Sequence, residues 1–81
     1  MMNIIKDSLT EQRLISLPPS CKFILYLLKR NGPLTQENIM RRSLLPKRTV
    51  VYSLRKLYDL NFIRKYGDKR DKRIRFYEIL I

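Results

Sequence analysis

The sequence predicts one small α+β domain, a three-helix core followed by a C-terminal β-hairpin, with a short helical extension at the N-terminus. Apolar residues recur at helical spacing up to about residue 60, and the remaining chain is rich in the aromatic and β-branched residues typical of strands. The 81 residues suffice for one hydrophobic core and no second. We therefore expect residues 1–17 to form the extension and residues 18–81 the main domain. Because a lone domain of this size is marginally stable, we also expect a homodimer.

The extension is expected to carry one short helix that ends before Pro18. Ser8 and Glu11 fit a capping box for a helix that begins at Leu9. Its helix-spaced apolar residues are Ile4, Ile5, Leu9, Leu14 and Ile15. These residues make the extension the candidate dimerisation helix, and packing against the domain's own core is the alternative.

The first core helix is expected after two consecutive prolines at residues 18–19, with Ser20 as its N-cap. Its apolar stripe consists of Phe23, Ile24, Leu27 and Leu28. The pair Asn31-Gly32 is a favourable C-cap. Cys21 would lie in the first turn, where a thiol can be reactive. We expect it instead to be a small buried apolar residue, because no second Cys is present to resolve an oxidised one.

The second and third core helices are expected to meet at a tight turn. Thr35 can cap a short helix that extends to about residue 42, with Ile39 and Met40 facing inward. Leu44-Leu45 interrupts this helix, and Pro46 is well placed to start another that ends at about residue 60. Two helices joined in this way form a helix-turn-helix.

The chain beyond Asn61 predicts a β-hairpin. Residues 62–66 and 74–79 have the composition of strands, and the segment from Gly67 to Lys72 has that of a turn. The expected order is therefore extension, three helices and a hairpin.

Positive charge is concentrated in the second half of the chain. The net charge is +11, and residues 41–81 hold thirteen basic and four acidic groups. Such a field attracts polyanions and indicates a nucleic-acid binder. A membrane surface would compete electrostatically, but no apolar segment is long enough to span a bilayer or to act as a signal peptide. We expect a cytoplasmic, nucleoid-associated protein that does not associate with a membrane.

Residue counts exclude most catalytic and metal chemistry. The chain has no His and one Cys, so it can build neither the usual Cys/His zinc site nor a triad with a His base. Neither a pair of carboxylates nor a phosphate-cradling Gly motif stands out. We expect no enzymatic activity, no metal and no cofactor.

The third core helix, residues 46–60, is predicted to have one apolar and one basic face. At about 100° per residue, Val50, Leu54 and Leu57 fall on one side. Residues 47–56 hold four cations and no acid, whereas an ordinary solvated face mixes both signs. A helix of this diameter fits the major groove of DNA. The predicted DNA-binding residues of this helix are Lys47, Arg48, Thr49, Tyr52, Arg55 and Lys56.

The residue types suggest different tasks on this face. Arg48 and Arg55 are the expected base readers, because the guanidinium fork matches guanine O6 and N7. The two lysines would reach phosphates, and the Thr and Tyr would touch a thymine methyl or a phosphate. The face carries no Asn or Gln to read adenine.

The hairpin supplies a second cluster of cations. Residues 64–75 hold seven Lys or Arg against two Asp. A cationic tip in or beside the minor groove would gain from the negative potential there. The predicted DNA-binding residues of the tip are Lys69, Arg70, Lys72 and Arg73. Asp71 would orient Arg73, and a charged edge that discourages strand aggregation is the alternative role of the cluster.

Residues 17–79 resemble a winged helix-turn-helix of the MarR family of transcriptional regulators. Residues 32–37 (GPLTQE) are similar to the family's Gly-Pro-Leu-Thr entry into the second helix. Residues 45–50 (LPKRTV) match the start of its recognition helix, L-x-x-x-T-V, with Asn61 where the family usually has Gly. Residues 71–73 (DKR) resemble the D-x-R of the family's wing.

This resemblance implies a dimeric regulator that binds a palindromic site, and some members sense small aromatic ligands beside a dimerisation lobe. The chain ends at Ile81, directly after the hairpin, so we expect it to lack the C-terminal helices that build this lobe. That argues against ligand sensing and leaves residues 1–17 for dimerisation.

The predicted function is a transcriptional regulator that binds duplex DNA with sequence preference. An architectural protein that grips phosphates without sequence choice is one alternative, favoured by the scarcity of adenine-reading side chains. A protein-interaction winged helix within the transcription machinery is another, in which the basic face would meet an acidic partner.

Overall fold

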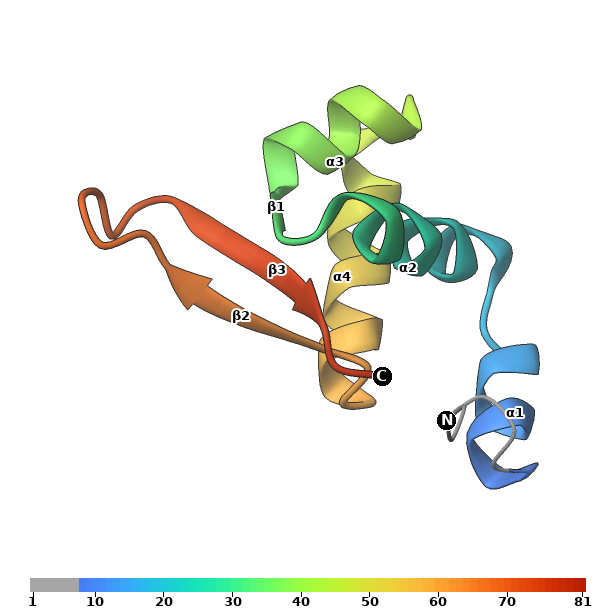
Figure 1. Cartoon of the computed structure of the whole chain (residues 1–81). Coiled ribbons are helices and arrows are strands. Elements are labelled where there is room, and N and C mark those ends of the chain that lie inside the picture. The colour runs from blue at the N-terminus through green and yellow to red at the C-terminus, as the bar shows by residue number, and fades with distance from the viewer. Residues whose placement is uncertain (1–7) are drawn as a thin grey trace.

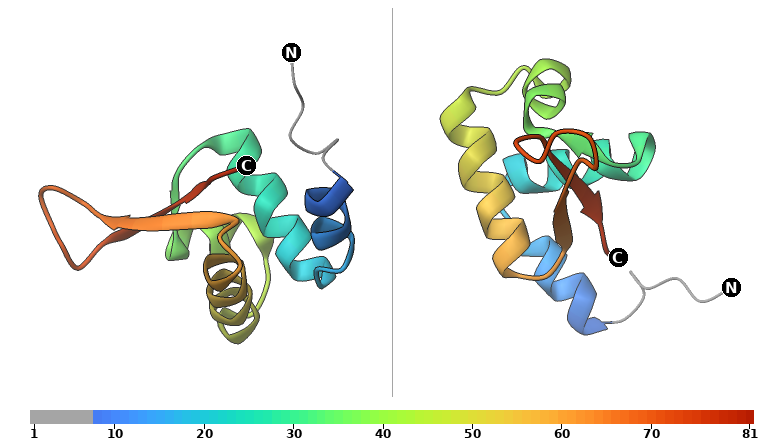
Figure 2. Two further views of the ribbon diagram at one scale, coloured as in Figure 1. Left: turned by 90° about the horizontal axis from the view of Figure 1, so that it is seen from below. Right: turned by 90° about the vertical axis from the view of Figure 1, so that its left-hand side faces the viewer.

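The computed structural model describes residues 8–81 and confirms the predicted α+β architecture (Figure 1). The helices are α1 (Ser8–Ile15), α2 (Pro19–Asn31), α3 (Gln36–Ser43) and α4 (Lys47–Asp59). The strands are β1 (Leu34–Thr35), β2 (Ile63–Gly67) and β3 (Arg75–Ile79). The hairpin of β2 and β3 projects well beyond the helices, on the side of the molecule away from α1 (Figures 1 and 2). None of the helices within residues 8–81 is long and apolar enough to cross a membrane.

Helix α2 begins two residues earlier than predicted, and the assignment of Ser20 as its N-cap was wrong. Pro18 is the N-cap and Pro19 is the first helical residue, because proline has no N–H to lose there and its ring fixes a helical φ. Ser20 lies in the first turn, with its Oγ 2.7 Å from Oγ of Ser53 on α4. At the other end Gly32 adopts φ 80° and donates its N–H to the Leu28 carbonyl, so the predicted C-cap is confirmed.

The turn between α3 and α4 follows the prediction. Thr35 caps α3 by accepting a hydrogen bond from the Asn38 N–H at 3.1 Å. Leu44 ends α3 in the left-handed region, with φ 60°. Pro46 is the N-cap of α4, which begins at the next residue.

Helix α4 ends in a Schellman motif. The Phe62 N–H donates to the Leu57 carbonyl at 2.9 Å, and the Asn61 N–H donates to the Tyr58 carbonyl at 3.0 Å. Asn61 takes the left-handed conformation that the motif requires, with φ 64°. Asparagine tolerates this region better than most residues do. It can therefore stand where the family that the sequence resembles usually has glycine.

A third strand, β1, was not predicted. It pairs antiparallel with β3, so β3 is the central strand of the order β1-β3-β2. Thr35 lies opposite Phe76, and Leu34 lies opposite Tyr77. The same short segment therefore starts α3 and anchors it to the hairpin.

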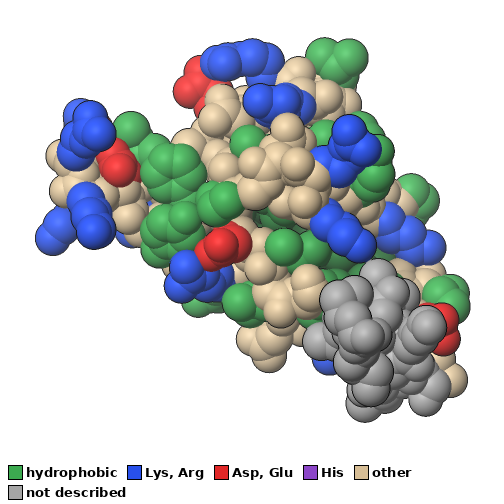
Figure 3. Space-filling view, in the orientation of Figure 1, with side chains coloured by type: hydrophobic (Ala, Val, Ile, Leu, Met, Phe, Trp, Pro, Cys, Tyr) green, Lys and Arg blue, Asp and Glu red, His purple; other side chains and the backbone are tan. Residues whose placement is uncertain are grey.

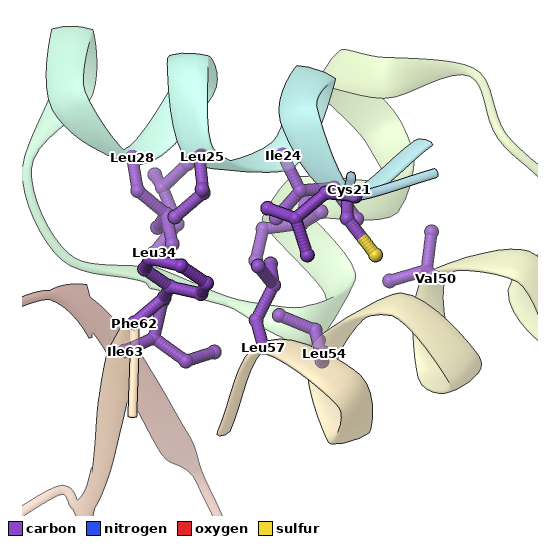
Figure 4. Close-up of a cluster of buried hydrophobic side chains, with 12 residues drawn as sticks. Cys21, Ile24, Leu25, Leu28, Leu34, Val50, Leu54, Leu57, Phe62 and Ile63 are labelled. Atoms are coloured by element: carbon purple, nitrogen blue, oxygen red, sulfur yellow. The ribbon is translucent and has the colours of Figure 1, made fainter. Parts of the chain in front are cut away.

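The core lies between α2, α3, α4 and the base of the sheet, and Figure 4 shows its side chains pointing toward one another. It consists of Leu17, Cys21, Ile24, Leu25, Leu28, Leu34, Ile39, Val50, Leu54, Leu57, Phe62 and Ile63. Cys21 is completely buried, as predicted. Ile39 is buried and Met40 packs against the core, so the predicted inward face of α3 is confirmed.

The extension contributes to this core as well as to the surface. Helix α1 begins at Ser8, one residue before the predicted start. Leu14 packs against the core, whereas Ile15 is 68% exposed. The predicted dimer contacts Ile4 and Ile5 lie outside the described residues.

Candidate nucleic-acid interface

The outward face of α4 carries the predicted helix residues. Val50, Leu54 and Leu57 are buried on the opposite face, which fixes the rotation of the helix about its axis. Four of the predicted residues are exposed, namely Lys47, Arg48, Tyr52 and Arg55, and two are half-buried, namely Thr49 and Lys56. The exposed four and Val51 line one shallow hollow on the outside of the helix.

The cations of this face have no anionic partner among the residues whose side chains are described. The ion pairs of that part of the chain join Arg41 to Glu37, Arg64 to Glu78 and Arg73 to Asp71. The only acid of α4 is Asp59, at its last position. The face therefore presents like charges that an external polyanion can neutralise.

The loop between β2 and β3 is organised around Asp71. Its Oδ1 accepts hydrogen bonds from Nε and the backbone N–H of Arg73, and its Oδ2 accepts one from Nη2 of the same residue, all at 3.0 Å. The Asp71 carbonyl also accepts the Ile74 N–H, and Asp68 donates its N–H to the Ile74 carbonyl. Asp71 thus orients Arg73, as predicted.

These contacts shift the acid–base equilibria of both partners. The Arg73 side chain, and after it the Arg73 backbone N–H, hold the pKa of the Asp71 carboxyl below its ordinary value. In return the carboxylate raises the pKa of the Arg73 guanidinium. The Arg73 side chain is nevertheless 90% exposed, so the carboxylate fixes its direction without covering it.

The other predicted loop residues, Lys69, Arg70 and Lys72, are exposed. Lys and Arg side chains gather around this end of the hairpin, and apolar side chains cover the stretch between it and the helices (Figure 3). The rings of Tyr66 and Phe76 stack in that stretch, with centroids 5.8 Å apart.

The structure also brings the hairpin close to the start of α3, which the sequence did not predict. Arg73 and Arg75 share a hollow with Thr35, Gln36 and Glu37. The β1–β3 pairing creates this arrangement, because Thr35 lies opposite the neighbour of Arg75.

The cations nearer the base of the hairpin contact the protein itself. Arg64 forms a 2.7 Å ion pair with Glu78, the residue opposite it on β3. The Lys65 ammonium lies 4.7 Å from the centre of the Tyr58 ring on α4. The charge of Arg64 is thus paired with an acid, whereas the aromatic contact of Lys65 joins β2 to α4 and leaves the lysine charge in place.

Seen from the hairpin side, α3, α4 and the loop all face the viewer, while α1 lies lower, beside the far end of α4 (Figure 2, right). The helix and the loop therefore belong to one side of the molecule, and a hollow joins the loop to α3.

A sequence comparison decides the family. The profile of the MarR family matches residues 15–74. The chain belongs to the MarR family. MarR proteins are DNA-binding regulators of transcription and not enzymes, in agreement with the predicted class of function. A search of curated proteins finds no match to the sequence.

Several solved structures have a similar fold. YusO from Bacillus subtilis has a TM-score of 0.76 and 21% identity, over 86% of this chain and 49% of its own. A MepR variant from S. aureus has a TM-score of 0.76 and 26% identity, over 91% and 54%. Reduced AbfR, solved bound to DNA, has a TM-score of 0.74 and 20% identity, over 84% and 49%. The chain thus spans about half the length of these three proteins.

Proposed function

We propose that this chain regulates transcription by placing α4 in the major groove of duplex DNA and the hairpin loop at the adjacent minor groove or backbone. The family assignment supports this class of function, and AbfR, which has a similar fold, was solved bound to DNA. Because such a protein works where the DNA is, we also propose a cytoplasmic, nucleoid-associated location.

The observation that carries the proposal is the outward face of α4. It presents exposed cations that no acid among the described side chains pairs with, on a helix whose rotation is fixed by buried residues on the other side. Arg48 and Arg55 are the proposed base readers, because arginine donates two parallel hydrogen bonds to guanine. Lys47 and Lys56 are proposed to reach phosphates, and Thr49 and Tyr52 a thymine methyl or a phosphate.

The loop is proposed to contact the minor groove through Arg73, whose direction is set by Asp71 before DNA arrives. A preoriented side chain loses less conformational entropy on binding than a free one. Lys69, Arg70 and Lys72 are proposed to contribute mainly to phosphate attraction.

We add Arg75 and the start of α3 to the interface. Arg73 and Arg75 line the shared hollow together with the start of α3, where the positive end of the helix dipole lies. The Glu37 carboxylate of the same hollow is paired with Arg41. A backbone phosphate between the two grooves would fit this chemistry.

We propose that the regulator is a homodimer and binds a palindromic site. Ile15 and Leu80, which are 68% and 51% exposed, are the apolar side chains proposed to take part in the contact. Sedimentation equilibrium at tens of micromolar tests this, and a monomer throughout would contradict it.

The proposed function is tested by selecting bound sequences from a pool of random duplexes at fixed salt. A palindromic consensus is expected, and competition with unrelated DNA should leave its complex intact. Binding without any consensus would indicate the architectural alternative. Binding weaker than about 10⁻⁴ M at physiological salt would instead favour the protein-interaction alternative.

A further inference from the structure

The end of α1 touches the corner at which the chain leaves α4 and enters the hairpin. The guanidinium of Arg13 donates a hydrogen bond to the Leu60 carbonyl, and its Cζ lies 4.8 Å from the centre of the Phe62 ring. Leu14 of α1 packs against the core that contains Phe62, and Leu17, in the connection to α2, belongs to that core. Helix α1 is therefore attached at a defined place beside the lower end of α4 (Figure 2, right).

The end of α4 leaves main-chain carbonyls that have no partner inside the helix. The carbonyls of Leu57 and Tyr58 are taken by the Schellman motif, and the Leu60 N–H donates to the Lys56 carbonyl. The Leu60 carbonyl is the acceptor that Arg13 takes up. A cation at this position also faces the negative end of the α4 dipole.

The corner determines how the two DNA-facing elements sit relative to each other. Phe62 is almost completely buried, and its carbonyl accepts the Leu80 N–H, which ties the end of β3 to the start of β2. A change in the backbone at residues 60–62 would swing the hairpin relative to α4. The loop lies at the far end of the hairpin, so a small rotation at the corner produces a large displacement there.

We propose that Arg13 is a positioning residue, which couples helix α1 to the relative placement of α4 and the loop and thereby raises the affinity for DNA. This inference rests on the proposed function. Arg13 lies two residues before the segment that matches the family profile, so the family assignment says nothing about it. It acts through the corner and needs no contact with DNA.

The first experiment compares Arg13→Met with Lys22→Met, which removes the same charge from an exposed position on α2. DNA binding is titrated over a range of salt concentrations. Arg13→Met should weaken binding by about three- to ten-fold beyond the control, with the same slope of log K against log salt as the control. If the slope of log K against log salt were smaller in magnitude than the control's by about 0.9, Arg13 would contact a phosphate itself. If the affinity equalled the control's, Arg13 would have no role. Either result would overturn the proposal.

A double-mutant cycle with Arg73→Ala tests the route of the effect. If Arg13 acts by placing the loop, its substitution should cost much less once Arg73 is absent. Additive effects of the two substitutions would overturn the proposal. Because wild-type binding is measured first, a failure of the proposed function is distinguished from a failure of this inference.

Hydrogen exchange on the free protein provides a readout that does not depend on DNA. Arg13→Met should speed exchange at the amides of Phe62 and Leu80 while leaving those of α2 and α3 near their wild-type rates. Arg13→Lys, which keeps the charge and an N–H donor group but not the planar guanidinium, should give an intermediate result. Equal acceleration throughout the domain would indicate a general loss of stability and would contradict a local positioning role.

Discussion

The outward face of α4 and the loop of the hairpin both present cations, but different physical causes hold them in place. On α4 the cations point outward because buried residues across the helix fix its rotation, and they have no anionic partner among the described side chains. In the loop no residue from 68 to 74 is buried, and a carboxylate two residues away sets the direction of Arg73. One set depends on distant packing and the other on local hydrogen bonds.

This difference indicates which substitutions should disrupt each half of the interface. Damage to the core should disorder the α4 face together with the whole domain, whereas damage to the loop should change DNA binding with little change in global stability. The two halves can therefore be separated by measuring stability and binding in the same variants.

The largest effect is expected from Leu57→Ala, which removes a fully buried side chain that anchors α4. The free energy of unfolding should fall by about 2–5 kcal/mol, because the variant loses buried apolar surface and leaves a cavity in the core. Urea denaturation followed by circular dichroism measures it. Val51→Ala, on the exposed face of the same helix, is the control and should change stability by about 0.5 kcal/mol or less. Similar losses in both variants would contradict the assignment of the two faces.

The next effect concerns DNA affinity alone. Arg48→Ala and Arg55→Ala should each weaken specific binding by about 1–3 kcal/mol and relax the preference at one base position, because each removes a base reader. Titration with the selected duplex and its single-base variants measures both. Lys47→Ala should instead weaken all sequences about equally and lower the salt slope. Unchanged titrations for both arginine variants would remove α4 from the interface.

A smaller effect is expected at Asn61, where α4 and the hairpin meet. Asn61→Ala should be less stable than Asn61→Gly by about 1 kcal/mol, because alanine is strained at the observed positive φ. Urea denaturation of the two variants side by side gives this difference directly. If alanine proved as stable as glycine, the left-handed conformation at the end of α4 would be wrong.

The smallest effect is the pH dependence of the loop. Because the folded-state pKa of Asp71 is lowered, its stabilisation of the loop should be complete above the ordinary carboxyl pKa and should disappear as the pH falls through the lowered one. NMR titration of the Asp71 carboxyl should give a midpoint below its ordinary value. The midpoint should return toward that value in Arg73→Ala, and an unchanged midpoint there would exclude the guanidinium as the cause.

Most of the fold was predictable because its signals are local. Helical apolar spacing, the Thr35 cap and the Gly32 C-cap each act within a few residues, and the structure confirms them. The strand β1 was missed because two residues carry too little pattern and its partner lies about 40 residues further along the chain. The N-cap of α2 was misassigned because two competing signals, a serine and a proline pair, stand side by side.

The candidate site was predictable to the same degree. The basic face of α4 follows from periodicity alone, and the Asp71–Arg73 contact follows from their spacing. The hollow shared by Arg75 and Gln36 could not be predicted, because it depends on the register of a strand that was missed. The contact of Arg13 with the α4 corner spans 47 residues and likewise has no local signal.

The central position of β3 has a mechanical consequence. Its hydrogen bonds run on one side to the residues that start α3 and on the other to the strand that follows α4. The start of α3 and the hairpin that carries the loop are thus hydrogen-bonded to the same strand, so neither can shift far without the other. Such a molecule holds the start of α3 and the loop at a fixed separation, which suits a duplex whose adjacent grooves have a matching spacing.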